Sequence, residues 1–221
     1  FNKNIKMKLT NFNVRGLAET SRILLAIMEE KYEDFRYPLK IIDWATHNMV
    51  RKEFENDKEE GKLVGSLNKL PFLDVDGVII PQSKSIERFV GTKYNMMGND
   101  AIEYARIDSI CEYVRDFKDM YQSVRRLPNE EKENGMKKWF SETLVERLES
   151  LEKILCNDHD HFSVGTRLSL SDVVLYSFAT QFFDDKESVT KSMAHCPNLI
   201  NIVNYVGELE PIVKWIKSRP D

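Results

Sequence analysis

The sequence has little cysteine, and its cysteines are not spaced for pairing. Cys111, Cys156 and Cys196 are odd in number and far apart, and no C-x-x-C motif occurs. Such a set argues against a disulfide framework and against a thiol redox pair. His159 and His161, in the sequence NDHDHF, have no further clustered ligand beside them. We therefore expect a solvated loop there and no metal site.

Long apolar runs and an excess of positive charge are also missing. No apolar stretch approaches the roughly 20 residues needed to cross a bilayer, and no stretch typical of a secretion signal opens the sequence. The formal net charge of −4 gives no electrostatic footprint for nucleic acid. We expect a cytoplasmic protein that binds neither membranes nor nucleic acid.

The first part of the chain alternates between strand and helix patterns. Ile5, Met7 and Leu9 alternate with polar residues, which is the period of a half-buried strand. Apolar residues at helical spacing predict a helix over residues 15–30, and residues 31–39 predict a second strand. This order is typical of a small α/β domain.

The segment that follows is more polar and gives weaker signals. Asp43 can open a short helix over residues 43–54. Residues 55–66 are highly charged and contain two glycines, so they predict a mobile loop.

The next segment, NKLPFLDVDGVIIPQSKSIERFV, has the clearest local signals. Two apolar runs flank Asp76 and Gly77, a dipeptide that suits a tight β-hairpin. Ser83 then stands where a helix begins. The first 93 residues therefore read β-α-β-α-β-β-α, with a linker at residues 94–100.

From residue 101 to residue 221 the pattern is helical throughout. One long apolar stripe runs from Ala101 to Arg126, and a second helix is predicted from about Asn129 to Cys156. Residues 169–183 are apolar almost all round, which predicts a central helix of the core. We therefore predict two domains, a thin α/β domain over residues 1–93 and an all-α domain over residues 101–221.

Two sites in the first domain suggest recognition of a small peptide-like anion. Pro71 can leave the backbone of Leu70 open to pair with an extended ligand, and the Leu70–Pro71 bond is of the kind that can be cis. Gln82 and Ser83 stand at a helix start, where free N–H groups favour a carboxylate. The alternative is structural: Ser83 only caps a helix, and Pro71 only starts an edge strand.

Several segments together resemble the glutathione transferases, most closely those of the sigma class. They are KLTNFNVRGLAE, NKLPFLDVDG, PQSKSIERFV, TRLSLSDVVLYS and WIKSRP, and the resemblance runs in order from about residue 6 to the end. It implies a thioredoxin-like N-terminal domain, an all-helical C-terminal domain, a homodimer and glutathione as a substrate. The SLSD segment also matches the capping box of the family, formed by Ser169 and Asp172.

The resemblance implies a glutathione site wherever the residues match. Gln82 and Ser83 match the residues that hold the γ-glutamyl carboxylate. Leu70, before Pro71, matches the residue whose backbone pairs with the cysteinyl unit, and Lys69 matches the lysine beside it.

Two further positions match more distant parts of that site. Trp44 matches the tryptophan that lines the glycyl end of glutathione. Asp116 matches the acidic residue that reaches across the dimer to the glutathione amine of the neighbouring subunit. Arg115 stands where a family member has another aspartate, so the resemblance does not imply a metal at the dimer interface.

The chain departs from the family pattern at the thiol. The residue after KLT is a tyrosine in the sigma class, and its hydroxyl donates to the glutathione sulfur, whereas here it is Asn11. An asparagine side chain can still donate through its NH₂ group. Arg15 and the helix start after the first strand can add positive potential. A family arginine two residues after Arg15 is replaced by Leu17.

A second departure concerns the glycyl end. A family lysine becomes Asn48, and about a dozen additional residues separate Trp44 from Lys69. The charged segment 51–62 can either supply Lys52 or Lys62 in place of that lysine or remain a solvated, mobile insertion.

We interpret the chain as a detoxification enzyme that adds the thiolate of glutathione to hydrophobic electrophilic small molecules, with thiol activation weakened or altered by Asn11. Isomerisation or peroxide reduction would use the same thiolate. The alternative is a catalytically weak protein of the same fold that binds glutathione or another ligand, or that has a structural role. Fold alone does not choose between them.

Overall fold

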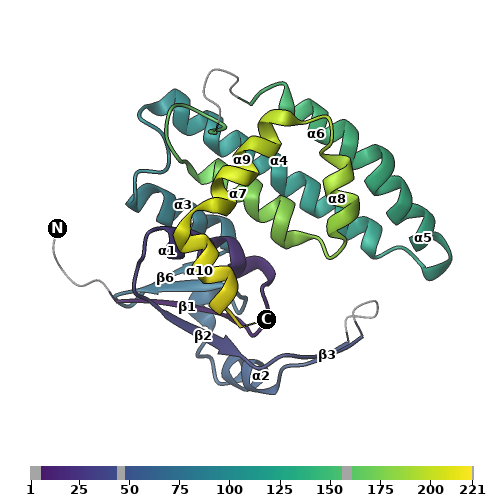
Figure 1. Ribbon diagram of the computed structural model, residues 1–221. Coiled ribbons are helices and arrows are strands. Elements are labelled where there is room, and N and C mark those ends of the chain that lie inside the picture. Colours follow the sequence, from purple (N-terminus) through teal and green to yellow (C-terminus); the bar gives the residue numbers. More distant parts are fainter. Residues whose placement is uncertain (1–5, 44–47, 156–160, 221) are drawn as a thin grey trace. The chain divides into compact units, whose positions relative to one another are not determined.

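The computed structural model describes residues 6–43, 48–155 and 161–220 (Figure 1). Contacts along the backbone divide the chain into two units. Unit 1 comprises residues 1–90 and 215–221, and unit 2 comprises residues 91–214. The expected combination of a small α/β domain with a helical domain is confirmed. The domain boundaries at residues 93 and 101 stay predictions.

The α/β part of the chain contains a small mixed sheet and its helices. In chain order the elements are β1 (Met7–Phe12), η1 (Gly16–Ala18), α1 (Glu19–Ile27), β2 (Glu33–Tyr37), β3 (Lys40–Asp43), β4 (Asn48–Val50), α2 (Lys52–Glu59), η2 (Val64–Ser66), β5 (Phe72–Val75), β6 (Val78–Pro81) and α3 (Ser83–Lys93).

The main sheet has four strands in the order β2-β1-β5-β6. β1 pairs with β2 in parallel, as a β-α-β unit requires, and with β5 in antiparallel orientation. The expected hairpin joins β5 to β6. At its turn Asp76 and Gly77 have φ values of 50° and 88°, and the N–H of Gly77 donates to Oδ1 of Asp74 at 2.7 Å. This parallel-then-antiparallel order is the thioredoxin-like arrangement.

Each face of the sheet is covered differently. In Figure 1, α1 and α3 lie on one side of the sheet and α2 lies on the other. The α2 side holds an aromatic cluster, because Phe54 of α2 packs edge-on against Phe12 of β1 at 5.1 Å and against Tyr37 of β2 at 5.8 Å. Leu70 and Phe72 pack against the same cluster.

The helix predicted over residues 43–54 is wrong for Asp43 and for residues 48–51, and it begins only at Lys52. Asp43 ends β3 and Asn48–Val50 form β4, two strands that pair in antiparallel orientation with Ile41 opposite Met49. The mobile loop expected from residue 55 is also wrong, since residues 52–59 form helix α2. Its sequence hides the helix because Phe54 is its one buried residue, and a single apolar residue gives no visible stripe.

Polar contacts fix α2 in addition to the aromatic ones. The hydroxyl of Tyr37 donates to Oδ2 of Asp57 at 2.6 Å, and Nζ of Lys62 donates to Oδ1 at 2.8 Å. Burial and this donation to Asp57 raise the pKa of Tyr37 to about 12. The hydrogen bonds from Lys62 and Tyr37 hold the pKa of Asp57 below its usual value.

The remaining elements are helical, as expected. They are α4 (Ala101–Arg125), α5 (Asn129–Lys138), η3 (Trp139–Thr143), α6 (Leu144–Glu152), α7 (Leu170–Ser177), η4 (Phe178–Phe182), α8 (Lys186–Ser192), α9 (Pro197–Glu208) and α10 (Glu210–Ser218). The predicted second helix is continuous from α5 through the π-helical turn η3 to the end of α6. α8 has no counterpart in the sequence prediction.

The core of unit 2 confirms the two strongest sequence signals. The stripe of α4 is buried, and the residues concerned are Ile107, Ile110, Cys111, Val114, Phe117 and Tyr121. The capping box of α7 is present: the backbone N–H of Ser169 donates to Asp172 at 2.7 Å, and that of Ser163 donates to the same carboxylate at 2.6 Å. Burial raises the pKa of Asp172 despite these bonds.

Candidate functional site

Three residues predicted for the site lie at one edge of the sheet. The register places Thr10 of β1 opposite Phe72 of β5, and Phe72 opposite Pro81 of β6. The next position along each strand is therefore Asn11, Pro71 and Gln82, so these residues follow one another across the same edge. In the sequence Asn11 lies 60 positions before Pro71 and 71 before Gln82, and strand pairing brings the three together.

Asn11 is largely enclosed at this edge. The residue is only 5% exposed. After β1 the chain turns back at Gly16, whose φ is +48°, and a Cβ at Gly16 would lie 3.8 Å from Nδ2 of Asn11. The amide nitrogen, a hydrogen-bond donor, thus lies beside this turn. Arg15 lies in the same turn with a partly exposed side chain.

The Leu70–Pro71 bond is cis. The side chain of Leu70 packs on the aromatic cluster under α2. Lys69 is exposed, and its backbone N–H donates to the carbonyl of Ser66 at 3.2 Å.

Helix α3 begins at the same edge. Gln82 has a φ of +73° and is exposed, and Ser83 is the first helical residue. The first helical hydrogen bond here runs from the N–H of Ile86 to the carbonyl of Gln82 at 3.0 Å. The N–H groups before Ile86 therefore point out of the helix, and with the helix dipole they favour an anion.

The residues predicted for the glycyl end of glutathione are spread over the inserted segment. Trp44 lies outside the described residues. Asn48 is an exposed residue of β4, and Lys52 is the exposed first residue of α2. Lys62 is engaged by Asp57 at 2.8 Å, and also by Glu60, so its charge is already paired.

Asp116 belongs to unit 2. It lies on α4 with 61% of its side chain exposed, and its carboxylate is 3.9 Å from the guanidinium of Arg115. Its predicted contact with glutathione across a dimer stays a prediction.

The structure adds one cation that the sequence did not reveal, Arg51, the residue before α2. Its guanidinium carbon lies 5.4 Å from the ring of Phe54 and 6.0 Å from that of Phe12, and its Nε lies 2.7 Å from Glu55. Phe12 directly follows Asn11, so this charge lies near the same sheet edge. In the sequence, the only sign of this arrangement was that Arg51 and Glu55 are four residues apart, the spacing of an ion pair on a helix.

The described part of the chain shows neither a metal site nor a membrane-spanning helix. Residues 6–43, 48–155 and 161–220 include no cluster of three or more His, Cys, Asp or Glu side chains placed to hold a metal ion. His161 stacks on Tyr205 at 5.1 Å, while His159 and Cys156 lie outside those ranges. Over the same ranges, no helix is long and apolar enough to cross a bilayer.

Comparisons with known proteins agree with this fold. The family model "Glutathione S-transferase, C-terminal domain" matches residues 115–219. The chain is 31% identical to hematopoietic prostaglandin D synthase of Gallus gallus and 28% identical to glutathione S-transferase 1 of Ascaris suum. Each comparison extends over 217 residues and covers 96% of both chains.

Solved structures share the fold at lower sequence identity. A monomeric glutathione S-transferase of Necator americanus, Na-GST-3, has a TM-score of 0.80 at 24% identity, and rat hPGDS complexed with a quinoline has 0.76 at 24%. Both comparisons cover 98% of each chain. The chain belongs to the glutathione S-transferase family, and among its relatives are proteins of the prostaglandin D synthase kind.

Proposed function

We propose that the protein is a glutathione transferase that adds the thiolate of glutathione to hydrophobic electrophiles. The observation that carries this proposal is the shared sheet edge, where Asn11, Pro71 and Gln82 follow one another across three strands beside the start of α3. This edge offers backbone groups to an extended peptide and helix N–H groups to its carboxylate.

Each part of the tripeptide has a matching group in this proposal. The γ-glutamyl carboxylate binds at Gln82 and Ser83, and the cysteinyl unit pairs with the backbone of Leu70 beside Lys69. The glycyl carboxylate lies toward the inserted segment, where the candidate partners are Trp44, Asn48, Arg51 and Lys52. In a cytoplasmic homodimer, the partner's Asp116 would contact the glutathione amine.

Asn11 gives the chemistry of the site its particular character. A neutral amide donor stabilises a thiolate at hydrogen-bonding distance and so lowers the thiol pKa, but less than a more acidic hydroxyl does. Because the thiolate is the nucleophile, each unit of thiol pKa above neutral lowers the reactive fraction about tenfold at neutral pH. Arg15 adds positive charge to the same turn. We therefore expect slower conjugation than a tyrosine would support.

Asn11 also supports a second candidate function, a protein that binds glutathione or another ligand with little turnover. Isomerisation or peroxide reduction would depend on the same thiolate as conjugation. Turnover therefore separates the enzyme from the binder, and the nature of the electrophile separates the kinds of enzyme.

The test combines calorimetry with turnover of a reactive aromatic halide. We expect glutathione to bind, and Asn11→Ala to lower turnover while Asn11→Tyr raises it and lowers the pKa of the bound thiol. Asn13→Ala, an exposed position two residues further along the chain, is the matched control and should leave both unchanged. Binding without turnover would support the binder. No uptake at millimolar glutathione would refute the transferase and any glutathione-binding role.

A further inference from the structure

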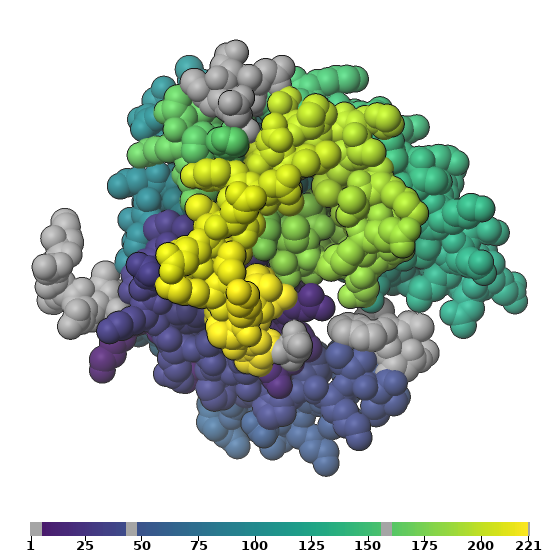
Figure 2. Space-filling model, in the orientation of Figure 1, coloured from purple at the N-terminus to yellow at the C-terminus, as the bar shows by residue number. Residues whose placement is uncertain are grey.

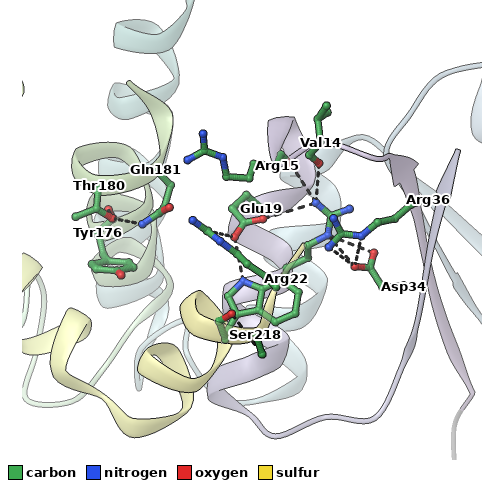
Figure 3. Close-up of polar contacts among 12 residues, drawn as sticks. Val14, Arg15, Glu19, Arg22, Asp34, Arg36, Tyr176, Thr180, Gln181 and Ser218 are labelled. Atoms are coloured by element: carbon green, nitrogen blue, oxygen red, sulfur yellow. Dashed lines mark hydrogen bonds and ion pairs between the residues drawn. The ribbon is translucent and has the colours of Figure 1, made fainter. Parts of the chain in front are cut away.

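A buried ionic cluster holds the turn that follows β1. Arg22 of α1 is fully buried, and its Nη1 donates to the carbonyl oxygens of Val14 at 2.9 Å and Arg15 at 3.2 Å (Figure 3). Its Nε lies 3.2 Å from Asp34 of β2, which Arg36 also contacts at 2.7 Å. One guanidinium thus joins the turn to α1 and to β2.

The end of the chain completes this cluster. Glu19 is 3% exposed, and its Oε1 accepts hydrogen bonds from Nε1 of Trp215 at 2.9 Å and from Nη1 of Arg219 at 2.5 Å. Its other oxygen lies 3.6 Å from Nη1 of Arg22. Figure 2 shows the last residues in yellow, lying on the purple segments of unit 1. A buried carboxylate needs such partners, because an uncompensated buried charge is strongly destabilising.

The turn lies beside Asn11. A Cβ added at Gly16 would stand 3.8 Å from Nδ2 of Asn11. The backbone N–H of Val14 donates to the carbonyl of Phe12, the neighbour of Asn11, at 2.8 Å. Arg22 holds the carbonyls of this turn, and Glu19 holds Arg22. A series of contacts within unit 1 therefore runs from Trp215 and Arg219 to the turn that lies beside the amide of Asn11.

We propose that Glu19 and Arg22 are positioning residues, through which the segment Trp215–Arg219 sets the place of the Asn11 amide. The effect of this positioning on catalysis rests on the proposed function, in which the Asn11 amide donates to the glutathione sulfur. The dependence is physical: Glu19 is shared by Arg22, Trp215 and Arg219. Losing Trp215 or Arg219 draws the guanidinium of Arg22 toward Glu19 and away from the carbonyls of the turn. A donor misplaced by about 1 Å can cost about a hundredfold in rate.

The experiment uses the full chain and two variants at the far end of the series. Trp215→Phe removes the indole donor and keeps an aromatic ring, and Arg219→Ala removes the charge. Lys217→Ala, on the same helix but exposed, is the matched control. The first readout is the NMR signal of the Asn11 side-chain amide without glutathione, assigned by its loss in Asn11→Ala. The second is the pH profile of kcat/KM for conjugation.

We expect both variants, and not the control, to shift the Asn11 signal and to lower kcat/KM about tenfold by raising the pKa of the bound thiol about one unit. The KM for glutathione should change little, and Arg219→Lys should restore most of the loss. If Arg219→Ala fails to fold, Trp215→Phe and Arg219→Lys still decide the outcome.

An unchanged Asn11 signal in Trp215→Phe and Arg219→Ala would overturn the inference, even in an active enzyme. An equal loss in Lys217→Ala would overturn it as well. If the wild-type chain binds no glutathione, the proposed function fails, and the NMR comparison alone still decides whether the end of the chain positions Asn11.

Discussion

The hydroxyl of Tyr37 on β2 donates a hydrogen bond of 2.6 Å to the carboxylate of Asp57 on α2. Tyr37 is the residue that pairs with Phe12 of β1, so this bond fastens the inserted helix directly beside the candidate site. Phe54 packs on both rings from the same helix. The insertion is therefore a docked part of unit 1.

The docking of α2 should depend on acid pH through Asp57. Its pKa lies below the ordinary 3.8, chiefly because Lys62 and then Tyr37 donate hydrogen bonds to the ionised carboxylate. A lowered folded-state pKa contributes stability that is present above pH 3.8 and is lost as the pH falls through the folded value. We expect Asp57→Asn to lower the urea midpoint at neutral pH and the difference from wild type to shrink below pH 3.8.

The control for that measurement is Glu59→Gln, an exposed acidic position on the same helix. It should show no comparable pH-dependent difference. A gap between wild type and Asp57→Asn that stays constant into acid would show that the carboxylate charge does not contribute to docking.

Phe54 should carry most of the apolar stabilisation of α2. It is 4% exposed and contacts two aromatic rings of the sheet. Phe54→Ala leaves a cavity in the cluster, and such changes cost about 3–5 kcal/mol in the free energy of unfolding. Urea denaturation measures the loss, with Glu59→Ala as the surface control. A loss below about 1 kcal/mol would mean that the cluster does not need α2.

Ser83 should contribute to glutathione affinity at the start of α3. A hydrogen bond to a charged group is worth about 1.5–3 kcal/mol, so Ser83→Ala should weaken glutathione binding by about tenfold or more. Calorimetry measures the change. Ser85→Ala, an exposed serine two residues further along the same helix, should bind as wild type does. Equal affinities for all three proteins would place the carboxylate elsewhere.

Arg51 should act on the glycyl carboxylate of glutathione. We expect Arg51→Ala to raise the KM for glutathione about tenfold, the scale of one charge-assisted hydrogen bond. The matched substrate is glutathione monoethyl ester, which lacks that negative charge and should lose little. Lys52→Ala tests the neighbouring cation in the same assay. Should Lys52→Ala, and not Arg51→Ala, discriminate against the free acid, the role belongs to Lys52.

Local signals in the sequence predicted the parts of the fold that local interactions determine. The Asp76–Gly77 turn, the apolar stripe of α4 and the Ser169–Asp172 capping box each lie within a few residues, and each is present. The insertion was misread because its helix is charged nearly all round and is held by the contacts of Phe54 and Asp57 with the sheet. Hydrophobic periodicity reports only on neighbours within one helix or strand, so it does not reveal contacts between α2 and the sheet.

Only part of the candidate site could be predicted from the sequence, for the same reason. The edge formed by Asn11, Pro71 and Gln82 depends on strand register, and the resemblance to a family, not the residue pattern alone, suggested that these positions belong together. Glu19 and Arg219 are 200 residues apart, and a buried ion pair over that separation leaves no trace in hydropathy. Arg51 was hidden because its position depends on the docking of α2.

The long separation between Glu19 and Arg219 also sets an order of events during synthesis. A ribosome adds about 5–20 residues per second, so Glu19 is made roughly 10–40 seconds before its last partner. Through that interval Glu19 has Arg22 beside it but has neither Trp215 nor Arg219. The polar cluster around Glu19 is therefore completed late, after all of the intervening helices have been translated.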